Sequence, residues 1–179
     1  MKPKKYVWEY LTLSLPLILA LVTIPNTLIL GQSSGGSETL TDTRLGTPFY
    51  KEQFKVTSVD NIMIDGKNGS VALFSGNGTL NGIAIKSSRK GLLVPRSNES
   101  AYIHGRVNFT ASEDSTVRAS YIFQAISHAH RDGISRSSGD AIFDEKAIGK
   151  LNILSNLVGI FKAESDNNGT GTFVMWKWK

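Results

Sequence analysis

The sequence predicts an all-β protein, a small antiparallel β-barrel of seven or eight strands with an N-terminal hydrophobic helix before it. From residue 50 onward, apolar and polar residues alternate with a period of two, which is typical of strands buried on one face. Pairs of Gly with Asn or Asp separate the alternating stretches, where tight turns are expected. Closing such a sheet removes its exposed edges, although a β-sandwich of the same strands remains the alternative.

A charge-free apolar stretch covers residues 10–30, directly after Lys2, Lys4 and Lys5. It is long enough to cross a membrane, and the lysines indicate a cytoplasmic N-terminus. We therefore expect residues 1–31 to be a signal peptide or an uncleaved signal anchor, and the rest of the chain to be exported to the cell surface or beyond. Two prolines inside the stretch favour cleavage near residue 31, whereas its length also suits an anchor that would make the membrane a partner.

The remainder divides into a linker and a folded domain. Residues 32–48 are rich in Ser, Thr and Gly and predict a flexible linker, and residues 49–179 form the predicted barrel domain. Sequons for N-linked glycosylation are compatible with an exported protein and begin at Asn68, Asn77, Asn98, Asn108 and Asn168.

The first strand and the region after it show the alternation in detail. Phe54, Val56 and Ser58 are expected to share one face of the first strand. A second region of strand covers 69–75 and 79–86. The Gly-Asn-Gly at 76–78 within it predicts a hairpin turn or a bulge.

Two central strands follow, at 101–111 and 116–126. Ile103, Val107 and Phe109 point one way in the first of them. In the second, one face carries Val117, Ala119, Tyr121, Phe123 and Ala125.

The C-terminal part predicts three more strands and one short helix. The strands lie at 140–145, 158–165 and 172–179, and leucines at helical spacing predict the helix within 146–157, before the penultimate strand. In the last strand Val174, Trp176 and Trp178 share a face. We expect Trp176 to be buried against the short helix.

The same part of the chain resembles a known family. The matching residues are Gly149, Lys150, Leu151, Leu154, Asn156, Val158, Gly159, Phe161, Glu164, Asp166, Gly169 and the closing Trp176-Lys177-Trp178-Lys179. They resemble a family of small exported archaeal proteins of uncharacterised function, typical of ammonia-oxidising lineages, although Lys177 stands where that family has Glu. The resemblance implies export and a small barrel, calycin-like or similar to allene oxide cyclase. It implies no catalytic residue.

Composition excludes several kinds of site. The chain has no cysteine, which excludes disulfides, thiol nucleophiles and zinc fingers. Nucleophile-elbow, phosphate-loop and HExxH motifs are absent from the sequence, so we expect no cofactor. His104, His128 and His130 are weak candidates for metal ligands, because the last two share a face if they lie on a strand. A polar strand end that runs into an Asp-Gly turn is the preferred interpretation of the last two, and we expect no metal.

The first nine residues, with three lysines and one glutamate, carry +2 of the net charge of +5, and the other basic residues are scattered along the chain, so we expect no nucleic-acid partner. Tyr102 and Tyr121 are candidates to line a pocket for a small apolar ligand. We therefore expect a non-catalytic extracytoplasmic barrel that binds a ligand or associates with the envelope. The alternative is a small-molecule isomerase or cyclase that uses the barrel interior.

A truncated chain tests the domain boundary. Deleting residues 1–31 should yield a soluble protein with the circular dichroism of a folded β domain, because the predicted strands begin well after the deletion. An unfolded truncated chain under native conditions would mean that the boundary is misplaced.

Overall fold

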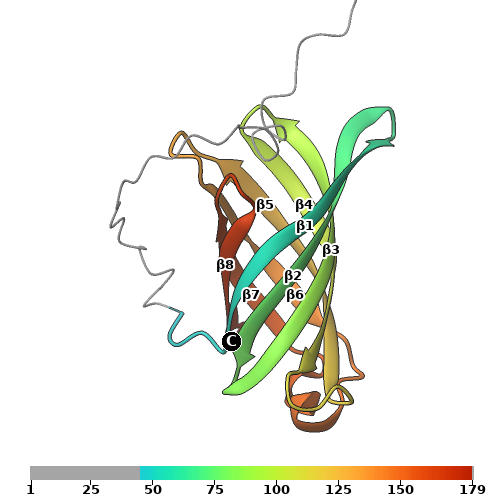
Figure 1. Cartoon of the computed structure of the whole chain (residues 1–179), viewed down its shortest axis with the longest axis vertical. Helices are drawn as coiled ribbons and strands as arrows, with labels where there is room; N and C mark the ends of the chain where they lie inside the picture. Colours follow the sequence, from blue (N-terminus) through green and yellow to red (C-terminus); the bar gives the residue numbers. More distant parts are fainter. Residues whose placement is uncertain (1–44, 179) are drawn as a thin grey trace, which may run out of the picture.

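Eight strands follow one another around a closed antiparallel barrel in the computed structural model, which describes residues 45–178 (Figure 1). The strands are β1 (Tyr50–Ile64), β2 (Lys67–Leu80), β3 (Ile83–Ser97), β4 (Ser100–Ala111), β5 (Arg118–Ala129), β6 (Ser135–Phe143), β7 (Val158–Ser165) and β8 (Thr170–Lys177). Each strand pairs with the next, and β8 closes the barrel by pairing with β1, where Tyr50 lies opposite Met175. The predicted all-β barrel is confirmed, and the sandwich is excluded.

The predicted hydrophobic helix, its membrane contact and most of the linker lie outside the described residues. Within residues 45–178, no helix has the length and apolar character that a membrane crossing requires.

The period of two places apolar side chains inside the barrel. Val107 and Phe109 of β4 and Tyr121 of β5 are buried in the core, as the alternation predicts. Ser58 is the exception, because a β-bulge shifts the register of β1 between Val56 and Ser58. Beyond the bulge, Val59 lies opposite the buried Ala72 and takes the inward position instead.

The Gly-Asn-Gly at 76–78 is neither a turn nor a bulge, so that prediction is wrong. β2 runs through it in continuous register with β1 and β3, and the turn comes at Asn81 and Gly82, whose φ angles are 47° and 81°. Gly76 is required for a different reason. A Cβ there would lie 1.7 Å from Oε1 of Glu52, so the missing side chain leaves room for a carboxylate inside the barrel.

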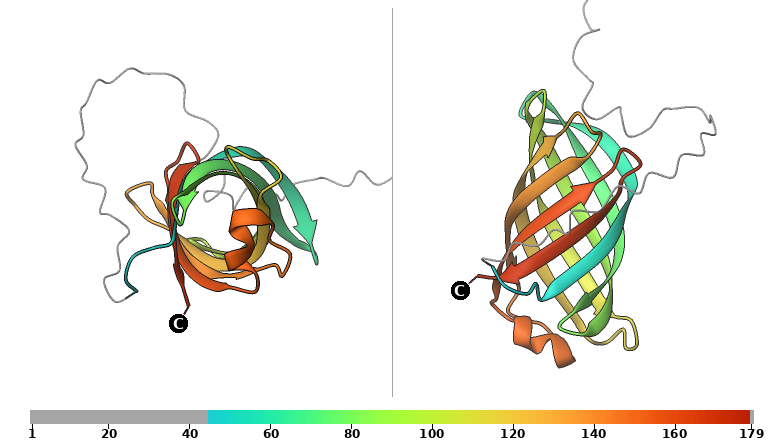
Figure 2. Two further views of the ribbon diagram at one scale, coloured as in Figure 1. Left: turned by 90° about the horizontal axis from the view of Figure 1, so that it is seen from below. Right: turned by 90° about the vertical axis from the view of Figure 1, so that its left-hand side faces the viewer.

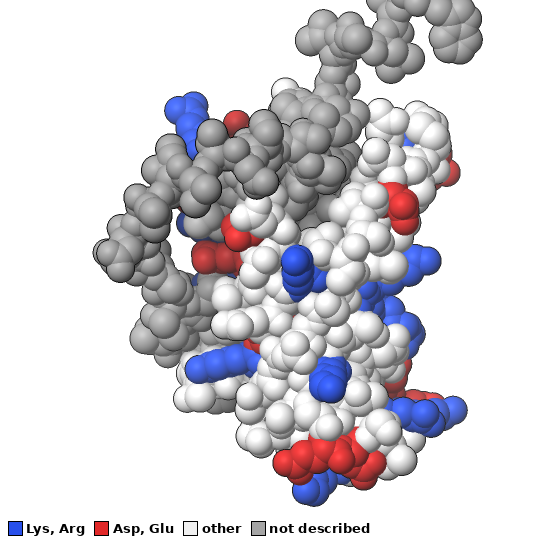
Figure 3. All heavy atoms as spheres, in the orientation of Figure 1, with Lys and Arg blue, Asp and Glu red and all other residues white. Residues whose placement is uncertain are grey.

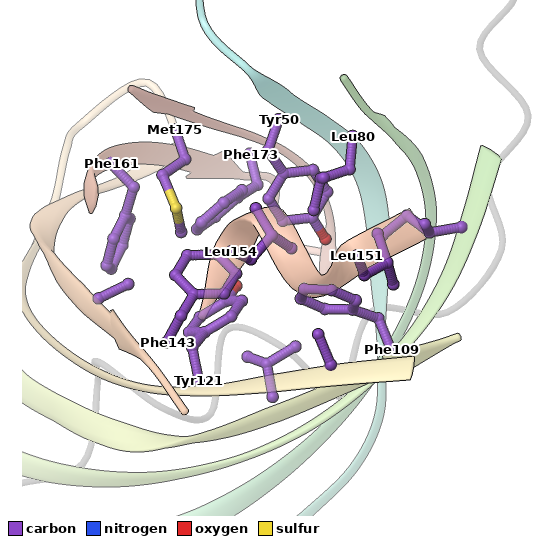
Figure 4. Packing of buried hydrophobic residues seen from close by; sticks show 14 of the residues in the cluster. Tyr50, Leu80, Phe109, Tyr121, Phe143, Leu151, Leu154, Phe161, Phe173 and Met175 are labelled. Carbon is purple, nitrogen blue, oxygen red and sulfur yellow. The ribbon is translucent and has the colours of Figure 1, made fainter. Parts of the chain in front are cut away.

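A short 3₁₀ helix, η2 (Gly149–Leu154), precedes β7 and covers one end of the barrel (Figure 2). It confirms the predicted helix, although it is shorter than the predicted range. Leu151 and Leu154 are fully buried and pack into the barrel core above Phe109, Tyr121 and Phe143 (Figure 4). We call this end the capped end, and the end with the β1–β2, β3–β4, β5–β6 and β7–β8 turns the open end.

The last strand faces the opposite way from the prediction. Phe173 and Met175 point into the core, so Val174, Trp176 and Trp178 lie on the outer face of the barrel. Trp176 is nevertheless buried, with 1% of its surface exposed, and its Nε1 donates a hydrogen bond to the carbonyl oxygen of Gly46 at 2.9 Å. Burial of Trp176 is thus confirmed, but its partner is the segment before β1, not the short helix.

Removing this indole tests how strongly that segment is held. Trp176→Ala should lower the free energy of unfolding by about 3–5 kcal/mol, because a large buried side chain is lost. Trp178→Ala is the matched control, since Trp178 is 65% exposed, and it should cost less than about 0.5 kcal/mol. Urea denaturation of both variants provides the measurement. A cost below about 1 kcal/mol for Trp176→Ala would show that the N-terminal segment does not cover it in solution.

Candidate ligand site inside the barrel

The open half of the barrel encloses a cavity of about 160 Å³. Its walls are mainly apolar and aromatic, with Phe54, Phe74, Phe123, Phe161 and Phe173 among them. Half-buried serines line it toward the open end: Ser127, Ser135, Ser137 and Ser165. Among the described residues η2 covers the capped end and no helix covers the open end. The cavity therefore has an apolar body and a polar rim.

A buried ion pair lies between this cavity and the packed core of the capped end. Glu52 of β1 and Arg89 of β3 form a salt bridge inside the barrel, with side chains 0% and 8% exposed. Tyr50 donates a hydrogen bond from its hydroxyl to Oε2 of Glu52 at 2.5 Å, and the Ser87 hydroxyl donates to Oε1. We call these four residues the Glu52 cluster. Its carboxylate accepts hydrogen bonds from three different side chains.

Aromatic rings surround the other charge of the pair. The guanidinium carbon of Arg89 lies 5.1 Å from the ring centroids of Phe54 and Phe173 and 5.9 Å from that of Phe74. Such cation–π contacts stabilise a cation that has left water. Burial acts to lower the pKa of Arg89, but Glu52 and the two buried tyrosines outweigh it, and the net pKa is raised. Arg89 is therefore held permanently charged at the floor of the cavity.

Two polar atoms at this floor have no partner. Among residues 45–178, neither Nε of Arg89 nor the hydroxyl of Tyr121 makes a hydrogen bond, although both atoms are buried. Both residues line the cavity. Burial, together with the charge of Glu52, raises the pKa of Tyr121 far above its ordinary value despite the opposing charge of Arg89. Tyr121 therefore remains a neutral phenol and a hydrogen-bond donor.

The two tyrosines predicted to line a pocket lie on opposite sides of the barrel wall. Tyr121 faces the interior cavity, whereas Tyr102 stacks on His104 on the outer face, with ring centroids 5.4 Å apart. The Tyr102 hydroxyl donates a hydrogen bond to Oε1 of Gln124 at 3.0 Å. Tyr102 and His104 line a separate outer groove of about 680 Å³ across β2–β6. The structure therefore does not bring the two tyrosines together.

The histidines are spread along two strands and a turn. His104 lies opposite Gln124, and His128 lies four residues further along β5, opposite Ser100. His130 follows the end of β5. In the described part of the chain, no three residues of the types His, Cys, Asp and Glu come together in a group that could hold a metal ion.

The predicted glycosylation sites and many of the charged side chains lie on the outside of the barrel. All of the sequon asparagines, Asn68, Asn77, Asn98, Asn108 and Asn168, are exposed. On the face shown in Figure 3, Lys and Arg side chains are dispersed, with Asp and Glu between them.

The sequence reasoning missed Glu52, Ser87 and Arg89. A signal for them was present, because Glu52 alternates in phase with Tyr50 and Phe54 and therefore points inward. A charged residue on the apolar face of a predicted strand indicates a buried ion pair or a site.

Comparison with known proteins adds information on the fold. No family model and no curated protein matches the chain. A conserved protein of unknown function from Rhodopseudomonas palustris has a TM-score of 0.60 and 10% identity, over 73% of this chain and 94% of that one. A protein with unknown function from Clostridium acetobutylicum has a TM-score of 0.52 and 12% identity, over 73% and 96% of the two chains. These likenesses show the barrel fold alone.

The two buried tyrosines should respond differently to loss of the hydroxyl. Tyr50→Phe should lower the free energy of unfolding by about 1.5–3 kcal/mol, because a hydrogen bond to a buried carboxylate is lost. Tyr121→Phe should cost less than about 0.5 kcal/mol or stabilise the fold, because its hydroxyl is buried without a partner. Urea denaturation of the two variants gives the comparison, and equal losses would contradict it.

Proposed function

We propose that this protein is an extracytoplasmic binding module that holds one small, largely apolar molecule inside its barrel. The observation that carries the proposal is the interior cavity of about 160 Å³ above a buried polar floor. An apolar cavity of about 150 Å³ is large enough for a benzene-sized molecule. Eight-stranded barrels are wide enough to hold one small ligand or to be filled by side chains.

The chain fills one half of its barrel and leaves the other half hollow. Toward the capped end, Leu80, Ile85, Leu151 and Leu154 are all buried and close the interior. Toward the open end, small residues stand at inward positions between the aromatic ones: Ala101, Ala125, Ala129, Ala163 and the rim serines. This change in side-chain size within one barrel supports a ligand site over a solid core.

The catalytic alternative, an isomerase or cyclase, needs an acid or base in contact with the ligand. Glu52 does not line the cavity and already accepts three hydrogen bonds. Tyr121 does line it, but its raised pKa makes it a poor base. The arrangement therefore favours binding.

The extracytoplasmic part of the proposal rests mainly on the sequence. The charge-free stretch at 10–30, the resemblance to exported archaeal proteins and the exposed position of every sequon asparagine support an extracytoplasmic location. None of these features bears on the ligand.

Benzene is the simplest probe of the cavity. Titration of the full chain with benzene in a mild detergent should shift the methyl NMR signals of Ala72, Ala125 and Ala163, which line the cavity. Ala125→Leu should abolish these shifts by filling the cavity. Ala84→Leu is the matched control, because Ala84 is exposed on the outside of β3, and it should leave them intact. Shifts that persist in Ala125→Leu, or no saturable shift in the unmodified protein, would overturn the proposal.

A further inference from the structure

We propose that the part of β1 beyond its pairing with β8 is a docking edge for a second copy of this chain. Two copies would pair antiparallel through the same residues of β1, so that the sheets of the two barrels continue into each other. Such pairing is a property of the barrel wall and does not depend on the proposed ligand.

On one side, β1 loses its neighbour near the middle of the strand. β8 pairs with β1 only from Tyr50 to Lys55. One further hydrogen bond joins the backbone N–H of Val56 to the carbonyl oxygen of Gly169 at 2.8 Å. β1 continues to Ile64, and within residues 45–178 its only strand neighbour there is β2. In Figure 2 the end of the β1–β2 hairpin stands away from the ring of the barrel.

The turn of this hairpin shows which backbone groups face the free side. Asp65 and Gly66 form a two-residue turn, with φ angles of 49° and 75°, between the paired residues Ile64 and Lys67. The residues that flank such a turn exchange two backbone hydrogen bonds, and every second residue along the strand repeats this arrangement. The residues between them direct their N–H and C=O groups to the free side. These are Val59, Asn61 and Met63, which we call the β1 edge.

The composition of this stretch does little to prevent pairing. Natural sheet edges are commonly protected by lysine, proline or inward-pointing charges. Residues 58–64 contain no proline, lysine or arginine, and Asp60 is their one charged residue. The side chain of Met63 is 65% exposed. An unpaired edge of this kind is a template for another strand.

The edge is complementary to itself. A two-fold rotation matches the donors of an antiparallel edge with its own acceptors, as in other interfaces between identical subunits. With the axis at Asn61, Val59 lies opposite Met63 of the second copy, and Asp60 lies opposite Ile62. An axis at Asp60 would instead place two carboxylates opposite each other, which is destabilising. The charge and the apolar residues therefore favour the register centred on Asn61.

Cross-linking tests this register. The chain has no cysteine, so an introduced thiol reports a single position. In the paired edges the Cα atoms of the two residues 61 should lie about 5.5 Å apart, whereas those of the two residues 63 should lie about 14 Å apart. The full chain carrying Asn61→Cys, in a large excess of mild detergent, should therefore form a covalent dimer with a short bifunctional thiol reagent. Met63→Cys is the matched control on the same edge, and it should give at most about a tenth as much dimer.

A proline at position 61 tests the backbone hydrogen bonds. Asn61→Pro removes the N–H that points to the free side and leaves the bonds to β2 in place. The dimer should weaken about ten- to hundredfold, because two hydrogen bonds across the axis are lost, one from each copy. Asn61→Ala is the matched control, since both variants lose the bond from the Ser70 hydroxyl to Oδ1 of Asn61, but only proline removes the backbone donor. Sedimentation equilibrium of the full chains in a density-matched detergent provides the measurement.

Three results would overturn the proposal. One is a monomeric full chain at protein concentrations at which its micelles hold several copies. Another is equal cross-linking of Met63→Cys and Asn61→Cys, which would indicate random collision or a different interface. The third is equal dimerisation of Asn61→Pro and Asn61→Ala. Association through the apolar stretch at 10–30 would give this third result, because that stretch does not contain the substituted position.

Discussion

The salt bridge between Glu52 and Arg89 is the interaction on which the interior of this barrel depends. Taking two ions out of water costs several kcal/mol for each, and the loss is offset when hydrogen bonds satisfy the charges. The residues around the Glu52 carboxylate supply such hydrogen bonds. Tyr50 and Ser87 donate to the carboxylate, and the absence of a side chain at Gly76 gives it space. Residues of β1, β2 and β3 thus surround one carboxylate. They reach it only because the three strands pair in this register, and their contacts with the carboxylate in turn stabilise that register.

The same interaction lies between two halves of the barrel that are filled differently. On the capped side, large side chains and the two leucines of η2 leave a packed core. On the open side, alanines and serines between the aromatic side chains leave a cavity. The carboxylate behind the floor of this cavity is held by hydrogen bonds, and such preorganisation would reduce the entropy that ligand binding must overcome. The ion pair therefore has a packed core on one side and, on the other, the cavity that we propose binds a ligand.

The sequence predicted the strands well because period-two alternation reports directly which side chains are buried. It also contained the distinction between the two tyrosines, since Tyr121 alternates in phase with Ala119 and Phe123, whereas Tyr102 is out of phase with Ile103. Three features could not be predicted from neighbouring residues in the sequence. The bulge after Val56 depends on pairing with β2, and the role of Gly76 depends on a carboxylate of another strand. Which tryptophan is buried depends on a backbone oxygen that is distant in the sequence.

The charge balance of the floor determines how recognition would respond to its surroundings. Arg89 remains protonated, and the pKa values of Tyr50 and Tyr121 are raised well above their ordinary value by burial. None of these three groups changes its charge near neutral pH, and buried charges are screened little by salt. Affinity for a largely apolar ligand should therefore vary little with pH or ionic strength. A change that separates Glu52 from Arg89 would act differently, because it would leave an uncompensated charge beside the cavity.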